Sequence, residues 1–204
     1  MTCKYKKMAI LGGTFDPIHI GHLMIAQQAC NNFELNKIIF MPAGIPPHKE
    51  KMKITASRHR LEMVKIAIND NPLFTISQWE LNKKRKSYTV DTLKYFENQN
   101  IAQEIYFIIG ADSLYDMFNW KNPDYLLNHS NFIVAARSGY SLEKTFKDQR
   151  FRDYEDNIHF LNNFKLDISS SMIRKQIKNN FPVKYLLPDE VIDYIHSNAL
   201  YKGD

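Results

Sequence analysis

The stretch Gly12-Gly13-Thr14-Phe15-Asp16-Pro17-Ile18-His19-Ile20-Gly21-His22 lies between an expected strand and an expected helix. The apolar run before it, residues 8–11, is long enough for a short buried parallel strand. The apolar spacing of residues 23–30 after it suits a helix. Gly12 and Gly13 have no Cβ, so the backbone there can come close to a ligand. This order of strand, glycine turn and helix predicts an α/β fold with a binding site at the turn.

Two histidines make this turn a candidate anion site. His19 and His22 are three residues apart, so both imidazoles lie on the same side of a first helical turn. Backbone N–H donors and the positive end of the helix dipole would add to their attraction for an anion. The alternative is a tight turn with two surface histidines. A glycine pair alone would favour that alternative, and the His-x-Gly-His spacing argues against it.

Length and composition favour one domain of a cytoplasmic protein. A chain of 204 residues can form a full core, and we expect residues 1–204 to be a single domain. No apolar run approaches the ~20 residues of a membrane helix, and the short run after the basic N-terminal residues does not fit a signal peptide. Cys3 and Cys30 do not make a disulfide framework, and we interpret both as thiols in a reducing compartment.

The basic character of the chain fits two classes of protein. The net charge is +5 and the isoelectric point is about 9. A nucleic-acid-binding module would gather this charge on one face, and a phosphate-handling enzyme would place it around a cleft. The densest basic run, Lys83-Lys84-Arg85-Lys86, is typical of a solvated loop. Composition leaves both classes open, so the motifs have to decide between them.

Strand-like apolar runs alternate with helical patterns along the chain. This alternation predicts a Rossmann-like, doubly wound parallel sheet with helices on both faces. In such a sheet ligands bind beyond the carboxyl ends of the strands, so the loops after the first and fourth strands should carry the site. We expect strands at residues 8–11, 37–41, 74–77, 105–109, 132–136 and 158–161. We expect helices at residues 23–33, 58–68 (with Ser57 as N-cap), 90–97 and 142–147, near residue 169, and from Pro188.

The glycine and histidine stretch resembles the T/HxGH signature of the nucleotidylyltransferase superfamily. Its form GGTFDPIHIGH looks like one branch, the bacterial nicotinate-nucleotide adenylyltransferases. That branch is also similar to this chain in PPHK at residues 46–49, SYTxDT at 87–92 and GxD at 110–112. The family's ISSTxIR segment matches residues 168–174, with Ser171 in place of threonine. The matches extend from Met8 to Ile195, which is nearly the whole chain.

The resemblance implies the reaction and its partners. It implies transfer of the adenylyl group of ATP to nicotinate mononucleotide, giving nicotinic acid adenine dinucleotide and pyrophosphate for NAD biosynthesis. Mg²⁺ would enter with ATP, and no closed set of zinc ligands is visible in the sequence. We expect no nucleic-acid or membrane partner, and a homo-oligomer is compatible with the sequence. Pantetheine-phosphate adenylyltransferase is a rival within the superfamily, but it lacks the pairing of SYTxDT with PPHK.

The resemblance also implies roles for single residues. It assigns catalysis to His19 and His22. Residues implied to bind ATP are Gly12, Gly13, Thr14, Phe15, Gly21, Gly110, Asp112, Ser169, Ser170, Ser171 and Arg174. Residues implied to bind nicotinate mononucleotide are His48, Lys49, Thr89, Trp120 and Arg137.

Several of these residues also have a simpler structural interpretation. Ser169–Ser171 can simply cap a helix, Trp120 can pack in the core, and Arg137 can belong to a structural ion pair. The chain departs from the family pattern at two places. Lys121 follows Trp120 where relatives often have an aromatic residue or histidine, and Ser138 replaces the proline that usually follows Arg137.

Overall fold

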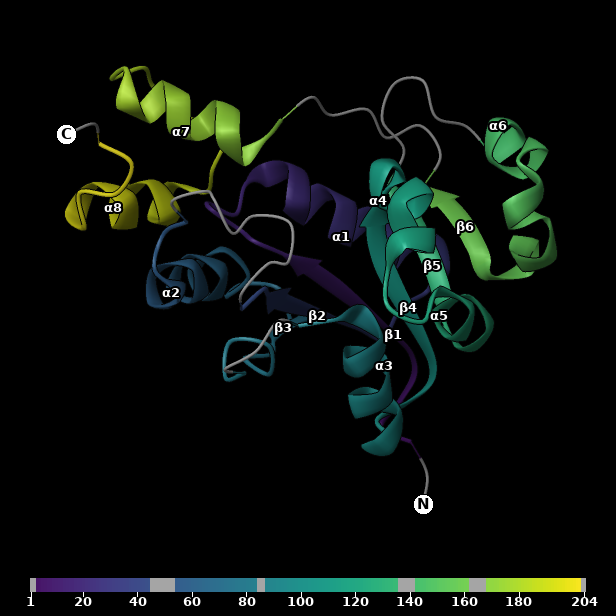
Figure 1. The fold of residues 1–204 in the computed structure, drawn as a ribbon. Helices are drawn as coiled ribbons and strands as arrows, with labels where there is room; N and C mark the ends of the chain where they lie inside the picture. The colour runs from purple at the N-terminus through teal and green to yellow at the C-terminus, as the bar shows by residue number, and fades with distance from the viewer. Residues whose placement is uncertain (1–2, 45–53, 84–86, 136–141, 162–167, 203–204) are drawn as a thin grey trace.

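A six-stranded, entirely parallel sheet forms the centre of the molecule, with strand order β3-β2-β1-β4-β5-β6 (Figure 1). The computed structural model describes residues 3–44, 54–83, 87–135, 142–161 and 168–202. Its strands are β1 (Tyr5–Gly13), β2 (Lys37–Pro42), β3 (Phe74–Ile76), β4 (Ala102–Gly110), β5 (Asn131–Ala135) and β6 (Ile158–Leu161). The predicted single-domain, doubly wound α/β fold is therefore confirmed.

The strand order changes direction between β1 and β4. From β1 the chain moves outward through β2 and β3, then crosses back so that β4 pairs with the free side of β1. Gly12 of β1 lies opposite Met41 of β2, and Leu11 lies opposite Ile108 of β4. The loops that leave these strands diverge at this point, and a crevice opens between them.

Helices cover both faces of the sheet and create two separate cores. The first core packs α1 (Ile20–Phe33), α2 (Ser57–Ala67), α7 (Ser170–Lys178) and α8 (Asp189–Ser197) against one face. The second core packs α3 (Thr89–Asn98), α4 (Ala111–Asp116), α5 (Pro123–His129) and the short 3₁₀ helices η1 (Met117–Asn119) and η2 (Gln149–Asn157) against the other. A central strand with both faces covered must be apolar throughout, and β1 has buried side chains from Met8 to Leu11.

The expected elements match the structure well, with corrections at their ends. All six strands are present, and the helix expected from residue 23 begins at Ile20 instead. Ser57 was expected to cap α2, but it is the first helical residue, and Ala56 occupies the cap position without a side-chain hydrogen bond. Pro188 caps α8 from outside the helix, whereas we expected it at the first helical position. Helices α4, α5, η1 and η2 were not expected; the first three have seven residues or fewer, and η2 is an irregular 3₁₀ segment with a kink at Tyr154.

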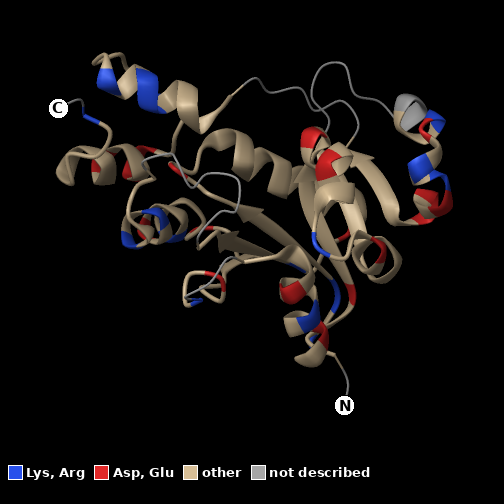
Figure 2. Cartoon of the chain, viewed as in Figure 1, with Lys and Arg blue, Asp and Glu red and all other residues tan. Residues whose placement is uncertain are grey.

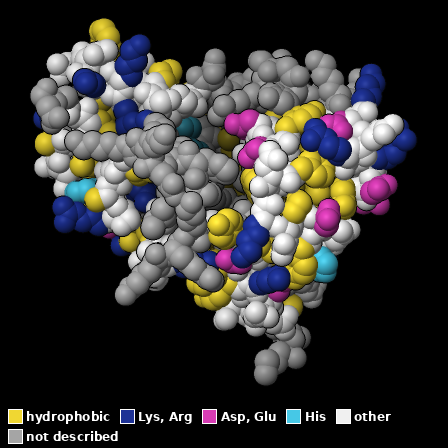
Figure 3. Space-filling model, in the orientation of Figure 1, with side chains coloured by type: hydrophobic (Ala, Val, Ile, Leu, Met, Phe, Trp, Pro, Cys, Tyr) yellow, Lys and Arg dark blue, Asp and Glu magenta, His cyan; other side chains and the backbone are white. Residues whose placement is uncertain are grey.

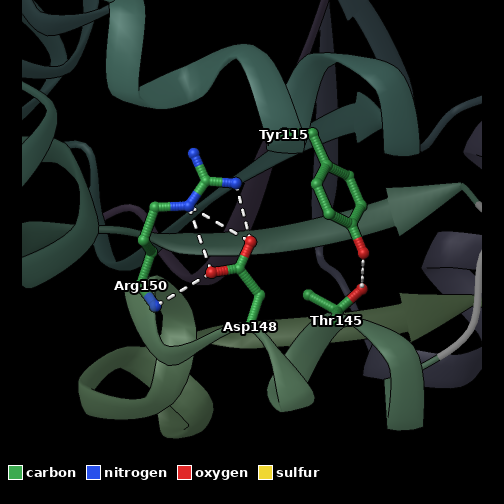
Figure 4. A network of polar contacts seen from close by, with 4 residues as sticks. All are labelled: Tyr115, Thr145, Asp148 and Arg150. Atoms are coloured by element: carbon green, nitrogen blue, oxygen red, sulfur yellow. Dashed lines mark hydrogen bonds and ion pairs between the residues drawn. The ribbon is translucent and has the colours of Figure 1, made fainter.

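A small polar network connects α6 (Leu142–Lys147) with α4 and caps η2 (Figure 4). The Asp148 side chain accepts a hydrogen bond from the Arg150 backbone N–H at 3.1 Å. Its Oδ2 also forms an ion pair with Arg150 Nη2 at 2.6 Å. These bonds hold the pKa of Asp148 below its ordinary value. The Tyr115 and Thr145 hydroxyls lie 3.1 Å apart and connect α4 with α6. Together these contacts cap η2 and join α6 to α4.

Phe151 is the apolar side chain that holds η2 against the second core. Its side chain is fully buried, and its ring meets Tyr115 edge-on at 5.5 Å and Phe118 at 5.0 Å between ring centroids.

Within the described ranges, no helix combines the length and apolar character needed to cross a membrane.

We expect Phe151→Ala to destabilise the fold by about 3–5 kcal/mol, because it removes a buried ring and leaves a cavity that can close only in part. Phe181→Ala is the matched control, since Phe181 is 61% exposed and its truncation should cost less than about 0.5 kcal/mol. Urea unfolding of the two variants measures the difference. Equal free energies of unfolding would show that η2 is not anchored through this ring.

Candidate active site

A cleft of about 800 Å³ opens at the carboxyl ends of β1 and β4, where the topology predicts a site. Its walls come from the turn between β1 and α1 and from the first turns of α3, α4 and α7. Figure 2 shows that α7 carries basic residues and α4 acidic ones, so the cleft is bordered by charges of both signs.

The two histidines of the turn form one compact unit. His19 is the N-cap of α1, and its backbone N–H donates to Nδ1 of His22 at 3.2 Å. The two imidazole rings stack with 3.6 Å between their centroids. Phe15 meets the His22 ring edge-on at 5.0 Å. His19 and His22 therefore have a fixed mutual arrangement, and both line the cleft.

Glycines in this turn are required for different reasons. A Cβ at Gly13 would lie 2.9 Å from the Phe15 ring, and one at Gly21 would lie 3.0 Å from Nδ1 of His19. Both distances are shorter than ordinary van der Waals contact, so a side chain there would displace an aromatic ring or a site histidine. Gly12 is different, because nothing lies within 4 Å of its Cβ position. That position faces open space in the cleft, where a ligand can approach the backbone.

The turn at residues 14–17 is held from beneath by a buried cation. Arg60 of α2 is 2% exposed; its Nη1 donates to the Thr14 carbonyl at 2.8 Å and its Nε to the Thr55 carbonyl at 3.0 Å. Burial lowers the pKa of this guanidinium, and the negative charge of Asp16 acts against that shift. Helix α2 therefore supports the turn in addition to packing on the first core.

The start of α7 is bonded to the same turn. The Ser170 hydroxyl donates to the Pro17 carbonyl at 2.8 Å, and Nη1 of Arg174 donates to the Asp16 carbonyl at 2.6 Å. The Ser169 side chain caps α7 by accepting from the Met172 N–H at 3.2 Å. Simple capping, the alternative considered for these serines, therefore applies to Ser169. Ser170 and Arg174 instead join α7 to the histidine turn.

The opposite wall of the cleft is the first turn of α3. Tyr88 is the N-cap and Thr89 the first helical residue. Thr92 donates its hydroxyl to Oε1 of Glu80 at 3.0 Å. Burial raises the pKa of Glu80, while the Thr92 hydrogen bond and the charge of Lys83 oppose that rise. A carboxyl group with a perturbed pKa thus borders the cleft next to a helix start.

Trp120 and Lys121 follow η1 on the same side. The indole of Trp120 is half-buried against the second core, lines the cleft, and donates Nε1 to Oδ2 of Asp116 at 3.3 Å. Lys121 extends to the start of α3, where its Nζ lies 3.4 Å from Asp91 Oδ1 and 4.9 Å from the Tyr88 ring centroid. Trp120 therefore packs on the second core and also exposes part of its surface to the cleft, so the structural and the ligand-binding interpretations are compatible.

Gly110 ends β4 and caps α4. A Cβ at Gly110 would lie 2.5 Å from Oδ1 of Asp112, so only glycine lets that carboxylate fold back over the helix start. Asp112 borders the cleft directly after a parallel strand, the usual place for a carboxylate that binds ribose hydroxyls.

Most residues predicted to form the site come together in this one cleft. Its lining includes Gly12, Gly13, His19, Gly21, His22, Thr89, Gly110, Asp112, Trp120, Ser169, Ser170, Ser171 and Arg174. Thr14 and Phe15 do not line it: Thr14 turns its carbonyl toward Arg60, and Phe15 is 2% exposed within the first core. His48, Lys49 and Arg137 lie outside the described residues.

Sequence reasoning missed several residues that shape the cleft. Glu80 and Tyr88 line it, while Arg60 and Asp16 support its floor. The burial of Arg60 left no signal, because its helix reads as an ordinary amphipathic one. Glu80 follows a strand of only three residues, so nothing indicated that it would turn toward α3.

Comparison with known proteins gives consistent matches. The Cytidylyltransferase-like family model matches residues 10–176. A protein named "Probable nicotinate-nucleotide adenylyltransferase" from Clostridium botulinum (strain Alaska E43 / Type E3) is 46% identical over 201 residues, covering 98% of this chain and 100% of that protein. Two structures of Plasmodium falciparum nicotinic acid mononucleotide adenylyltransferase, one complexed with APC and one with NaAD, have the same fold. Their TM-scores are 0.75, at 23% and 24% identity, over 96% of this chain and 97% of theirs.

Glu80 makes stability depend on pH in a defined direction. Because burial raises its pKa, the native state binds more protons than the unfolded state between the two pKa values, and stability falls as pH rises through that window. Gln in its place keeps an acceptor for Thr92 but cannot ionise. We therefore compare the melting temperatures of the unaltered protein and of Glu80→Gln. The unaltered protein should lose stability relative to the variant as the pH rises from about 4 to about 7.

Differential scanning fluorimetry across this range measures the effect. Glu62→Gln is the control, because the Glu62 carboxylate is 43% exposed on α2, where it pairs with Lys65. A difference for Glu80→Gln that stays constant with pH would contradict the assignment.

Proposed function

Because this chain belongs to the nicotinate-nucleotide adenylyltransferases of the cytidylyltransferase-like family, we propose that the cleft between β1 and β4 joins ATP to nicotinate mononucleotide. The chain transfers the adenylyl group of ATP to the mononucleotide, and the products are nicotinic acid adenine dinucleotide and pyrophosphate. The observation that carries this assignment to the cleft is the stacked His19–His22 pair. It lies at a helix start, beside an open glycine position, at the point where the strand order reverses.

The chemistry asks the protein for positioning and charge stabilisation. The phosphate of nicotinate mononucleotide attacks the α-phosphorus of ATP in line, and a new P–O bond forms as the bond to the β-phosphate oxygen breaks. That phosphate is already anionic at neutral pH, so no side chain has to remove a proton from it. The residues needed are donors directed at the oxygens where charge accumulates. His19 and His22 supply such donors at the start of α1.

We assign the ATP end of the cleft to the loops after β1 and β4 and to α7. The backbone at Gly12 and Gly13 would lie against ATP, and Asp112 would accept hydrogen bonds from the ribose. Ser169, Ser171 and Arg174 would hold the β- and γ-phosphates. Nη1 of Arg174 already donates to the Asp16 carbonyl. A guanidinium has five N–H donors, so others are left for a phosphate.

The pyridine end of the cleft belongs to α3 and Trp120. The indole offers a flat surface for stacking, and the first turn of α3 offers backbone N–H groups near Thr89. We include His48, Lys49 and Arg137 as further contacts of the mononucleotide, because the family resemblance implies them.

Mg²⁺ would enter bound to ATP. Among the described residues, no three His, Cys, Asp or Glu side chains form a group suited to hold a metal ion. An ion carried by nucleotide phosphates needs no such group, because Mg²⁺ usually keeps its waters and binds through one or two carboxylates plus phosphates. Bound in this way it would neutralise phosphate charge, and Asp112 or Asp116 at the cleft margin could accept hydrogen bonds from its waters.

We further propose a cytoplasmic enzyme that acts on free nucleotides. Cys3 and Cys30 are both free thiols, and this state fits a reducing compartment. On the face in Figure 3, Lys and Arg side chains lie in separate groups on both sides, and acidic side chains lie among those on the right. This interrupted distribution supports small anionic substrates over a nucleic-acid duplex, which favours a continuous basic surface.

We expect His19→Ala and His22→Ala each to lower kcat by about 100-fold or more while the proteins remain folded, since each removes a preorganised donor from the transferring phosphate. Pyrophosphate release under saturating substrates measures kcat, and circular dichroism checks the fold. His129→Ala is the control, because His129 is exposed on α5, where its imidazole stacks on Tyr125 and lies outside the cleft lining. Near-normal kcat in both site variants would refute their catalytic role.

The same assay tests the substrate assignment. Nicotinate mononucleotide should be preferred over its amide by about 100-fold in kcat/KM. Stacking on Trp120 cannot distinguish the two rings, but N–H donors near Thr89 can bind both oxygens of a carboxylate, whereas an amide would oppose a donor with a donor. Trp120→Ala should weaken both substrates and leave most of the preference intact. Equal kcat/KM values would contradict this view of the pocket, and absence of pyrophosphate release would contradict the function itself.

A further inference from the structure

Asp16 belongs to the histidine turn, yet its side chain points away from the cleft and into the protein. It is 5% exposed and does not line the cleft. Its Oδ1 accepts a hydrogen bond from the Tyr201 hydroxyl at 2.7 Å, and its Oδ2 accepts from the Thr55 backbone N–H at 3.2 Å. Arg60 is also close enough for its charge to act on Asp16. This carboxylate is therefore fully engaged beneath the site.

The rest of the turn is held just as firmly. Arg60 binds the Thr14 carbonyl, Arg174 binds the Asp16 carbonyl and Ser170 binds the Pro17 carbonyl, at 2.6 to 2.8 Å. Three segments far apart in sequence thus converge on residues 14–17: helix α2, helix α7 and the turn after α8. Only Ile18, which is completely buried, separates this turn from His19.

The turn after α8 reaches Asp16 by way of an unusual backbone. Ala199 and Tyr201 both have left-handed backbone angles, with φ of 51° and 62°. Residues other than glycine adopt this conformation only where their surroundings enforce it. Leu200 between them packs on the first core, and the Tyr201 hydroxyl also lies 3.9 Å from the Met63 sulfur. Burial and the charge of Asp16 raise the pKa of Tyr201, so its hydroxyl remains a proton donor.

We propose that Tyr201 is a positioning residue for adenylyl transfer: its hydroxyl fixes Asp16, and the turn fixed in this way sets His19 and His22 at the start of α1. Tyr201 does not line the cleft and touches no reacting atom, so it acts only through Asp16. The proposal rests on the adenylyl-transfer function assigned above.

A small displacement of the turn is enough for a large effect. Reacting groups must be held within a fraction of an ångström, and a misplacement of about 1 Å can cost about 100-fold in rate. The first turn of α1 is independently held by the Ile20 N–H, which donates to the Leu186 carbonyl at 2.9 Å. Loss of the Tyr201 hydroxyl should therefore loosen the turn without releasing the helix. We expect its effect on catalysis to be smaller than that of removing a histidine.

The test compares Tyr201→Phe with Tyr194→Phe. Tyr194 lies on α8, is half-buried like Tyr201, and also bonds through its hydroxyl to a residue of α2, His59, at 2.9 Å. Its hydroxyl and its ring both contact His59, which is not a residue of the histidine turn. We expect kcat of Tyr201→Phe to fall about tenfold, or about 1.4 kcal/mol of barrier, with each KM changed less than about threefold. Tyr194→Phe should keep kcat within about twofold while losing a similar amount of thermal stability.

A double-mutant cycle then asks whether Tyr201 acts through Asp16. Asp16→Asn keeps the size of the side chain but weakens the acceptor, and the kcat of Asp16→Asn/Tyr201→Phe should be no lower than that of Asp16→Asn alone. Multiplicative losses in the double variant would overturn the proposal. Equal kcat values for Tyr201→Phe and Tyr194→Phe would overturn it as well. Lack of activity in the unaltered protein would instead defeat the proposed function, so the two failures are distinguishable.

Discussion

The burial of Asp16 with Arg60 is the constraint on which the site depends. Two opposite charges lie beneath the histidine turn, with Asp16 5% and Arg60 2% exposed. A buried charge is costly unless hydrogen bonds satisfy it, so Arg60 needs the Thr14 and Thr55 carbonyls, and Asp16 needs the Thr55 N–H and the Tyr201 hydroxyl. The pair therefore enforces a specific arrangement of the turn, the loop at Thr55 and the segment after α8. Helix α7 can then join the same turn through Ser170 and Arg174.

With the turn fixed, three long helices begin at the same cleft. The N-caps His19, Tyr88 and Ser169 belong to α1, α3 and α7, and all three line it. Each helix start brings backbone N–H groups and the positive end of its dipole to the cleft. This concentration of donors can attract polyphosphates even though α4 carries acidic residues at the cleft margin. A small net charge on the whole chain is therefore sufficient for an enzyme that binds two nucleotides.

The sequence predicted the parts of the structure that depend on local patterns. Apolar runs located all six strands, and the parallel topology then placed the loops after β1 and β4 at one edge. Most residues that the motif resemblance implied for the site line one cleft, and their individual roles stay predictions. The pattern could not show Tyr201 reaching Asp16, because 185 residues separate them and only the packed helices bring them together. The motif likewise gave no sign that the Phe15 ring is buried in the first core against His22.

Lys121 departs from the family pattern, and neighbouring residues of α3 accommodate its charge. Its ammonium group lies 3.4 Å from Asp91 and 4.9 Å from the Tyr88 ring centroid, and its side chain is 47% exposed. An ion pair this exposed contributes little to stability, because water screens it. Asp91 nevertheless offsets the charge at the cleft margin, so selectivity for a carboxylate would depend on the fixed N–H groups at the start of α3. Thr92 and Glu80 brace that helix start from inside, and the lysine can vary without moving it.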